Sequence, residues 1–354
     1  MLKQELGITR IDAIIPGGRY HNMKDFLSFP SIGRSSLQNP VMPGIASKAL
    51  DNQRNYFKVI RDQDVLLHYP YHDFYHFTEW LRQAAMDPAV ESIRISLYRV
   101  ASSSLVIKAL LDAVANGKDV FVIVELQARF DEEANIRWWK VLTDAGVHVS
   151  FGIANLKVHS KLCLITRNED GEFVRYAHIG TGNFNEKTAR IYTDFTLLTA
   201  RPEITEEVRD VFAFIQAPYR PVNFKHLWVS PLTQRNEINR RIEREITLAE
   251  SGRPARILIK VNNLADQDLV TKLYEASRAG VRIDACVRGM CTLVPGIPGM
   301  SDRIRVISIV DRFLEHPRVA IFYNDGDPEV FISSADWMMR NLDNRVEVAT
   351  PIYD

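Results

Sequence analysis

Two short motifs in this chain carry a histidine followed, two residues later, by a cation. His159 and Lys161 precede the apolar run Leu162 to Ile165, and His316 and Arg318 precede a second apolar run. An apolar run of this kind predicts a buried strand, and side chains two residues apart lie on the same face of a strand. Each motif therefore places an imidazole and a cation in one pocket, and the chain carries this chemistry twice.

Each motif is followed by a strand that runs into small polar residues. Gly180 to Asn185 follows the first motif, and Ser333 to Asp336 follows the second. Backbone N–H groups of such a turn can bind an anion, although such a turn can also simply end a strand. Lys161, Arg318 and Asn183 are accordingly candidates for contacts with phosphate oxygens.

The residue types of the two motifs suit phosphoryl chemistry. For a neutral imidazole to attack a phosphoryl group, one ring nitrogen must be free and the developing charge must be met by cations. His159 is the predicted nucleophile. His316 could protonate the leaving oxygen or bind a nucleotide phosphate, because a pKa near neutrality suits either task.

Two arginines follow predicted strands. Arg99 comes directly after the strand predicted at residues 93–98, and Arg129 follows the strand that ends at Glu125. Open α/β sheets bind ligands beyond the carboxyl ends of their strands. Both guanidinium groups are therefore expected to project into the same pocket.

The composition limits the class of protein. With 354 residues the chain is too long for one ordinary core, so two domains are expected. Lys+Arg number 44 and Asp+Glu number 44, and this balance argues against nonspecific binding to nucleic acid. The 3 cysteines lack metal-ligand spacing and point to a reducing cytoplasm rather than to a disulfide scaffold. No apolar run is long enough to span a membrane.

Strand and helix signals alternate in both halves of the chain. The predicted elements are strands at 93–98, 119–124 and 147–151 with helices at 104–115 and 131–144, then strands at 256–261 and 281–287 around a helix at 266–278. Alternating signals of this kind favour an α/β fold with largely parallel, helix-covered sheets. The helical segments 105–110 and 269–274 correspond, which indicates an internal duplication.

The domain boundaries follow from breaks in this pattern. Residues 1–60 are rich in turn formers and are interpreted as a lead-in segment. Ala217 to Pro221 interrupts the alternation. We therefore predict a first catalytic domain over 61–217 and a second over 218–354.

These motifs resemble the phospholipase D superfamily, whose two repeats bring two histidines to one phosphoryl centre. The closer resemblance is to bacterial polyphosphate kinase of the first type, in segments 15–22, 96–99, 158–162, 182–185 and 311–316, and it runs from about residue 4 to the last residue. It implies two phospholipase D-like α/β/α domains with mixed, largely parallel sheets. The family's whole chain is longer, so the resemblance implies a catalytic fragment whose second domain is truncated at its C-terminal end.

Each of the two histidine motifs differs from the phospholipase pattern at one position. Phospholipases usually carry an aspartate after four further residues beyond the cation, whereas Thr166 stands at that place after Lys161 and Tyr323 stands there after Arg318. The missing carboxylates weaken the phosphodiesterase interpretation and favour the kinase.

The resemblance to the kinase implies roles for individual residues. It implies that the γ-phosphoryl group of ATP is carried on His159 as a phosphohistidine and then passes to the end of a polyphosphate chain. It places His316, Tyr192 and Arg288 at the ATP site, with Tyr192 stacking or donating its hydroxyl and Arg288 binding phosphate.

The same resemblance associates Arg99 and Arg129 with magnesium. Because an arginine is always protonated, we expect these two residues to contact phosphate oxygens that Mg²⁺ also touches. Mg²⁺ is therefore the expected cofactor.

The leading hypothesis is thus an ATP:polyphosphate phosphotransferase that acts on ATP, ADP and inorganic polyphosphate. The alternatives are a phospholipase D-type phosphodiesterase or transferase, and a fragment that only binds phosphate. The resemblance also implies a homo-oligomer and a cytoplasmic protein that can associate peripherally with the inner membrane, with no nucleic acid as a partner.

Overall fold

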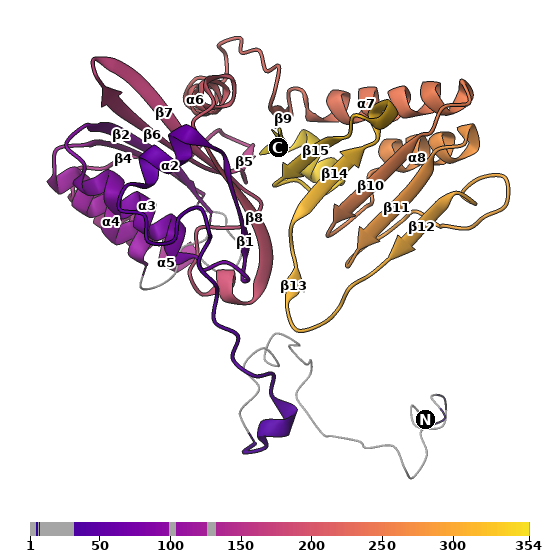
Figure 1. Ribbon diagram of the computed structural model, residues 1–354, viewed down its shortest axis with the longest axis horizontal. Coiled ribbons are helices and arrows are strands. Elements are labelled where there is room, and N and C mark those ends of the chain that lie inside the picture. The colour runs from indigo at the N-terminus through magenta and orange to yellow at the C-terminus, as the bar shows by residue number, and fades with distance from the viewer. Residues whose placement is uncertain (1–4, 6, 8–31, 99–103, 126–131, 354) are drawn as a thin grey trace. The chain divides into compact units, whose positions relative to one another are not determined.

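The computed structural model describes residues 5, 7, 32–98, 104–125 and 132–353 of the chain (Figure 1). The chain divides into two compact units, residues 1–42 and 43–354. In the first unit the described residues include the short 3-10 helix η2 (Ser35–Leu37), which has no buried residue. The second unit holds both histidine motifs.

The last residues of the predicted lead-in segment, residues 1–60, pack against the first half of the chain. Helix α2 (Tyr56–Asp62) buries Phe57 and Ile60, and Leu50 is also buried in the same core. Residues 50–60 therefore pack as part of the first half, because their apolar side chains find a surface there that the local turn-rich sequence did not indicate.

The first half is built on one mixed sheet. Its elements in chain order are β1 (Val65–Tyr69), α3 (Tyr75–Met86), β2 (Val90–Leu97), α4 (Leu105–Ala115), β3 (Asp119–Val124), α5 (Glu132–Asp144), β4 (His148–Ser150), β6 (Lys161–Glu169), β7 (Glu172–Gly180), η3 (Thr188–Arg190), β8 (Tyr192–Thr199) and α6 (Pro202–Gln216). The strand order is β1-β8-β7-β6-β2-β3-β4. β2, β3 and β4 pair in parallel, and the other neighbours along this order pair antiparallel.

The second half repeats this plan. Its elements are β9 (Trp228–Ser230), α7 (Gln234–Glu250), β10 (Arg256–Val261), α8 (Gln267–Ala279), β11 (Arg282–Val287), β12 (Ile304–Ile307), β14 (Arg318–Phe322), η4 (Asn324–Gly326), β15 (Glu329–Ser333), α9 (Met339–Asp343) and β16 (Arg345–Ile352). β10, β11 and β12 pair in parallel, and β14, β15 and β16 follow as antiparallel strands. The two halves thus share one mixed α/β architecture, as the sequence predicted.

Two short strands pair with the sheet of the opposite half. β5 (Lys157–Val158) runs parallel to β16 in the second sheet. β13 (Leu314–Glu315) runs parallel to β8 in the first sheet. Each of these strands ends directly before a motif histidine, so this exchange brings both histidines to the place where the halves meet.

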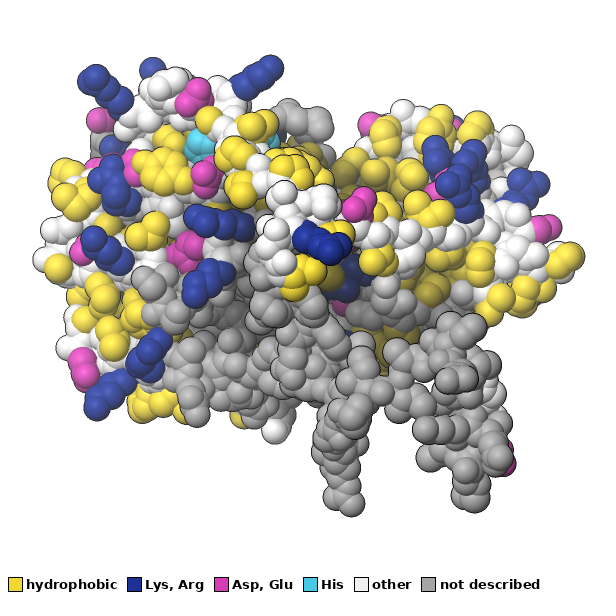
Figure 2. Space-filling view, turned by 90° about the horizontal axis from the view of Figure 1, so that it is seen from below, with side chains coloured by type: hydrophobic (Ala, Val, Ile, Leu, Met, Phe, Trp, Pro, Cys, Tyr) yellow, Lys and Arg dark blue, Asp and Glu magenta, His cyan; other side chains and the backbone are white. Residues whose placement is uncertain are grey.

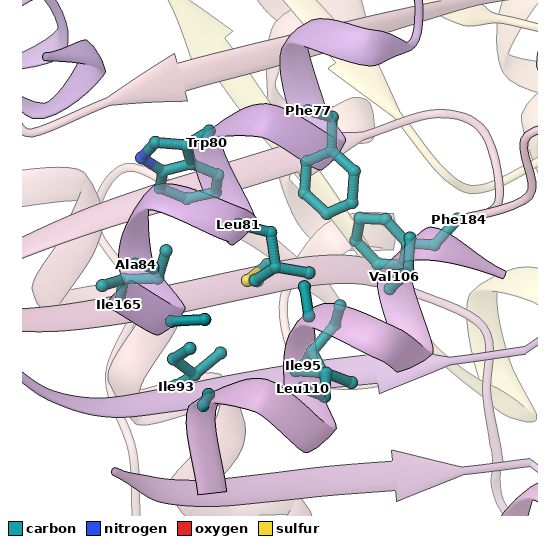
Figure 3. Close-up of a cluster of buried hydrophobic side chains, with 14 of the residues drawn as sticks. Phe77, Trp80, Leu81, Ala84, Ile93, Ile95, Val106, Leu110, Ile165 and Phe184 are labelled. Carbon is teal, nitrogen blue, oxygen red and sulfur yellow. The ribbon is translucent and has the colours of Figure 1, made fainter. Parts of the chain in front are cut away.

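The described residues form three hydrophobic cores, one within each half and one between the halves. The first lies between the first sheet and helices α3 and α4 (Figure 3), and the second lies between the second sheet and helices α7 and α8. Figure 3 labels Phe77, Trp80, Leu81 and Ala84 from α3, Ile93 and Ile95 from β2, Val106 and Leu110 from α4, and Ile165 and Phe184.

The third core joins the two sheets. It combines Leu162 and Leu164 of β6 with Val346 and Val348 of β16, and α6 covers it with residues such as Val208. Burial of these apolar side chains stabilises the boundary between the halves. Because β6 and β16 also carry or flank site residues, packing of this core fixes the geometry of the site.

Charged side chains are interspersed on the surface. On the face shown in Figure 2, lysine and arginine side chains lie among acidic and hydrophobic ones and do not form one continuous basic stripe. The helices of the described residues include none that combines the length and the apolar character needed to cross a membrane.

Candidate active site

His159 is oriented by a carboxylate from the other half of the chain. Its Nδ1 atom lies 2.8 Å from Oε2 and 2.9 Å from Oε1 of Glu347 on β16. Glu347 is fully buried, and it accepts hydrogen bonds from Ser334 Oγ at 2.5 Å and from Asn341 Nδ2 at 2.7 Å. The ring of Tyr98 packs edge-on against the imidazole, with centroids 4.8 Å apart.

The charges around His159 determine its protonation. Burial lowers the pKa of His159, and the Glu347 carboxylate only partly opposes this effect. Burial alone would raise the pKa of Glu347, but the nearby His159 and Lys161 hold it below its usual range. The imidazole is therefore neutral near pH 7, its Nδ1–H donates to the ionised Glu347, and the Nε2 lone pair remains available.

Lys161 holds the backbone of the same motif. Its side chain is 2 % exposed, and its Nζ donates a hydrogen bond to the carbonyl oxygen of His159. The ammonium group also lies 5.3 Å from the centre of the Tyr98 ring. Burial lowers the pKa of Lys161 to about 7; Glu347 opposes this shift, and Arg318 adds to it. Lys161 therefore contributes less than a full positive charge near neutral pH.

His316 is also oriented by a carboxylate, but here the histidine comes from the second half of the chain and the carboxylate from the first. Its Nδ1 lies 2.8 Å and 3.0 Å from the two carboxylate oxygens of Asp194 on β8. Thr181 Oγ1 donates to Asp194 at 2.6 Å, and a side chain at Gly182 would overlap the same carboxylate. Burial lowers the pKa of His316, with Asp194 opposing. The glycine in the turn after β7 is therefore required by the position of Asp194.

Arg318 lies beside His316 and is held by a buried carboxylate. Its Nη1 lies 3.2 Å from His316 Nε2, and its Nε donates to Asp336 Oδ1 at 3.1 Å. Burial alone would raise the pKa of Asp336, but Arg318 holds it far below its usual range. An arginine can only donate, so His316 Nε2 accepts in this arrangement and its proton resides on Nδ1.

The predicted nucleotide residues gather around His316. The Tyr192 ring lies 5.4 Å from the His316 ring. Arg288 Nε donates to Asn262 Oδ1 at 2.6 Å and to the carbonyl oxygen of Glu315, the residue before His316. Burial lowers the pKa of Arg288, and the charge of Arg318 adds to this effect. Tyr192, Arg288 and Arg318 therefore lie around one imidazole.

Asn183 lies in the turn behind Asp194 rather than among the cations. With Tyr69, His178 and Asp194 it lines a cavity of about 10 Å³. Its Oδ1 atom is buried and has no hydrogen-bond partner among the described residues. A cavity of this size has room for about one water molecule, which would satisfy that oxygen.

The two arginines expected near magnesium, Arg99 and Arg129, lie outside the described residues. Within the part of the chain that the structure describes, no group of three or more His, Cys, Asp or Glu side chains is placed to hold a metal ion. Glu347, Asp194 and Asp336 each bind a histidine or an arginine instead. The described residues therefore do not fit a resident Mg²⁺ site made of carboxylates.

Three functional residues were missed by sequence reasoning, namely Glu347, Asp194 and Asp336. A signal was present for Glu347, which stands alone as a charge within the apolar run Val346 to Ala349. A buried charge requires a partner. The partner could not be identified because it comes from the other half of the chain.

The fold and the site define the class of this protein. Two α/β halves exchange strands, and each half supplies one histidine together with the carboxylate that orients the other histidine. This is a mixed α/β fold built from two similar halves. At the level of the fold it is shared with the phosphatidylserine synthase structure from Haemophilus influenzae Rd KW20, at a TM-score of 0.54 and 11% identity over 83% of this chain and 82% of that chain.

The chain belongs to the polyphosphate kinase family. Residues 55–221 match the family model described as polyphosphate kinase C-terminal domain 1, and residues 227–354 match C-terminal domain 2. The polyphosphate kinase of Vibrio vulnificus (strain CMCP6) is 59% identical over 350 residues, which cover 99% of this chain and 50% of that protein. The chain thus spans about half the length of the curated relatives it matches.

A solved structure supports the same assignment. The polyphosphate kinase structure from Porphyromonas gingivalis matches with a TM-score of 0.85 and 41% identity, covering 96% of this chain and 56% of that chain.

Proposed function

We propose that the chain carries the phosphotransfer site of a polyphosphate kinase, in which the γ-phosphoryl group of ATP moves reversibly to the end of a polyphosphate chain through phosphorylated His159. The observation that carries this proposal is the contact between His159 Nδ1 and the buried Glu347 carboxylate. That contact fixes the proton on Nδ1 and leaves Nε2 as the nucleophile.

The first step forms a bond between His159 Nε2 and the γ-phosphorus of ATP. The bond from that phosphorus to the β,γ-bridging oxygen breaks, and ADP leaves with the electron pair. The imidazole keeps its Nδ1 proton, so the phosphorylated ring is cationic and the ionised Glu347 stabilises it. No proton has to be moved by another residue.

The second step reverses this chemistry on a different acceptor. A terminal oxygen of polyphosphate attacks the phosphorus, the bond from phosphorus to Nε2 breaks, and neutral His159 returns. The longer polyphosphate is the product. Because the phosphoryl group leaves one phosphate oxygen, that of ADP, and ends on another of similar chemistry, that of polyphosphate, the sequence of steps runs in either direction.

His316 and Arg318 serve the nucleotide phosphates in this proposal. Arg318 now donates to His316 Nε2, so His316 holds no proton there to give to a leaving oxygen. We therefore assign His316 to holding the Arg318 guanidinium beside the nucleotide phosphates rather than to acid catalysis. Arg318 and Arg288 supply the guanidinium donors for phosphate oxygens, and Tyr192 contacts the nucleoside.

Mg²⁺ belongs to this proposal as the ion that accompanies ATP. The described carboxylates are engaged elsewhere, so the ion is expected to bind phosphate oxygens, with Arg99 and Arg129 contacting the same oxygens. Neither step above depends on a metal ligand from the protein.

The labelling of His159 tests the proposal directly. The chain is incubated with γ-³²P-ATP and Mg²⁺, and the protein is examined for label that is acid-labile and alkali-stable. Wild-type protein and His148→Ala, a control at an exposed histidine on β4, should both be labelled. His159→Ala should not be labelled. Absence of label from folded wild-type protein would refute the proposal.

The same protein preparation distinguishes the kinase from a phosphodiesterase and from a fragment that only binds phosphate. A phospholipase D-type enzyme would cleave a phosphodiester substrate in the absence of ATP. The fold shared with a phosphatidylserine synthase makes this the second candidate. A fragment that only binds phosphate would bind ATP or polyphosphate without acquiring label.

A further inference from the structure

The internal duplication lets the positions around the two histidines be matched one to one. His159 corresponds to His316, because each follows an exchanged strand. Glu347 on β16 corresponds to Asp194 on β8, because each binds the Nδ1 atom of the histidine from the other half. The two sides of the site therefore differ only where matched residues differ.

The matched residues differ in charge two positions before each carboxylate. At that position β16 carries Arg345 and β8 carries Tyr192. Their partners across the parallel ladders are Lys157 and Leu314, respectively. At this matched position the His159 side thus carries two cationic residues, whereas the His316 side carries an aromatic ring and a leucine. Arg288 and Arg318 lie elsewhere around His316.

Arg345 is placed to act at His159. Residues two apart in a strand share a face, so its side chain lies on the face that carries Glu347. Its Nη1 atom lies 3.9 Å from Glu347 Oε1, beyond hydrogen-bond distance, and the side chain is 19% exposed. Its charge is also close enough to lower the pKa values of His159 and Lys161.

The His316 side is apolar at the equivalent place. Leu314 is 37% exposed and Ile191 is 54% exposed. The two are joined by a hydrogen bond of 2.9 Å from Leu314 N to the carbonyl oxygen of Ile191. The Tyr192 ring next to them faces His316. A flat, uncharged group such as a nucleobase or ribose would be compatible with this surface, and a chain of phosphates would not.

We propose that Arg345, with Lys157 beside it, forms the subsite that binds polyphosphate next to His159, while the nucleoside end of ATP lies on the Tyr192 side. Polyphosphate carries a negative charge on every unit and has no base, so it requires cations and gains nothing from an aromatic surface. The inference rests on the proposed function. It adds to that function which substrate lies on which side of the site.

The test measures the binding of two ligands to the same set of variants. Calorimetry gives the dissociation constants of the 354-residue chain for inorganic polyphosphate of one defined length and for a non-hydrolysable ATP analogue, over a series of NaCl concentrations. The variants are Arg345→Gln, Lys157→Gln and Tyr192→Leu. Arg278→Gln removes one charge from an exposed position on α8 and serves as the matched control.

Arg345→Gln should weaken polyphosphate binding at least about tenfold and leave binding of the ATP analogue within about twofold. The slope of log Kd against log salt should fall by about one for polyphosphate, as expected when one phosphate contact is lost. Tyr192→Leu should do the opposite, weakening binding of the ATP analogue while leaving the affinity for polyphosphate nearly unchanged. Equal effects on both ligands, an unchanged polyphosphate affinity, or wild-type protein that binds no polyphosphate would each overturn the subsite.

The proposed function and the subsite can fail separately. If Arg345→Gln is labelled by γ-³²P-ATP but binds polyphosphate as wild type does, only the subsite is wrong. If wild-type His159 is never labelled, the proposed function is wrong, and the subsite is still decided by the two binding constants. Thermal unfolding of each variant identifies any effect that arises from a loss of structure.

Discussion

Replacement of Glu347 by glutamine separates the charge of this side chain from its hydrogen bonds. Oε1 now accepts from Asn341 at 2.7 Å and lies 2.9 Å from His159 Nδ1. A glutamine carbonyl oxygen can keep both contacts. The amide nitrogen then faces Ser334, whose hydroxyl group can rotate to accept. The variant therefore keeps the Oε1 contacts and loses the negative charge, and it also places an amide N–H beside the His159 Nδ1–H that Oε2 faces at 2.8 Å in the wild type.

The size of the effect follows from the cationic ring of the phosphorylated intermediate. Two unit charges about 4 Å apart interact by about 4 kcal/mol at an effective dielectric constant of about 20. The amide dipole retains part of this energy, so a loss of about 2–4 kcal/mol is expected, which corresponds to a rate that is slower by about 30-fold to 1000-fold.

Rapid-quench measurement of label formation in a single turnover provides the assay. Glu245→Gln is the matched control, because Glu245 is fully buried in α7 and accepts backbone N–H groups of Arg256 and Asn324 but touches neither histidine. Circular dichroism establishes that each variant is folded. A folded Glu347→Gln protein that forms phosphohistidine within about threefold of the wild-type rate would refute the reasoning.

Two further predictions concern stability. Burial lowers the pKa of Lys161 to about 7, so above this pH the unfolded state binds more protons than the folded state and stability rises with pH. Urea unfolding between about pH 7 and pH 8.5 should show a gain on the order of 1 kcal/mol that is absent from Lys161→Met, and equal slopes would contradict it. Leu164→Ala, which opens a cavity in the core shared by the two halves, should cost about 2–5 kcal/mol and lower one common thermal transition. Separate transitions for the two halves, or a cost below about 1 kcal/mol, would show that this core does not join them.

The sequence located both histidines because the signals for them are local. A histidine, a cation and an apolar run within a few residues predict a strand with both side chains at its start, and His159 and His316 lie at the predicted places. The alternating signals also predicted the parallel strands β2, β3 and β4 and, in the second half, β10 and β11, whereas β12 was not predicted. The antiparallel strands complete the mixed sheets.

The partners of the histidines could not be predicted because they are distant in the chain. Glu347 is 188 positions from His159, and Asp194 is 122 positions from His316. Their contacts depend on the exchange of β5 and β13, which are two residues long and have no periodicity to detect. The packing of α2 against the first half could not be predicted for a related reason, since Phe57 and Ile60 are buried by residues that are distant in the chain.

The orientation of His159 leads to a chemical outcome that can be measured at one atom. The contact between Nδ1 and Glu347 leaves only Nε2 to accept the phosphoryl group. Peptide mapping of ATP-treated protein by mass spectrometry, followed by nuclear magnetic resonance of the phosphorylated imidazole, identifies the residue and the nitrogen. The account predicts phosphate on Nε2 of His159. Phosphate on Nδ1 of His159, or on His316, would contradict it.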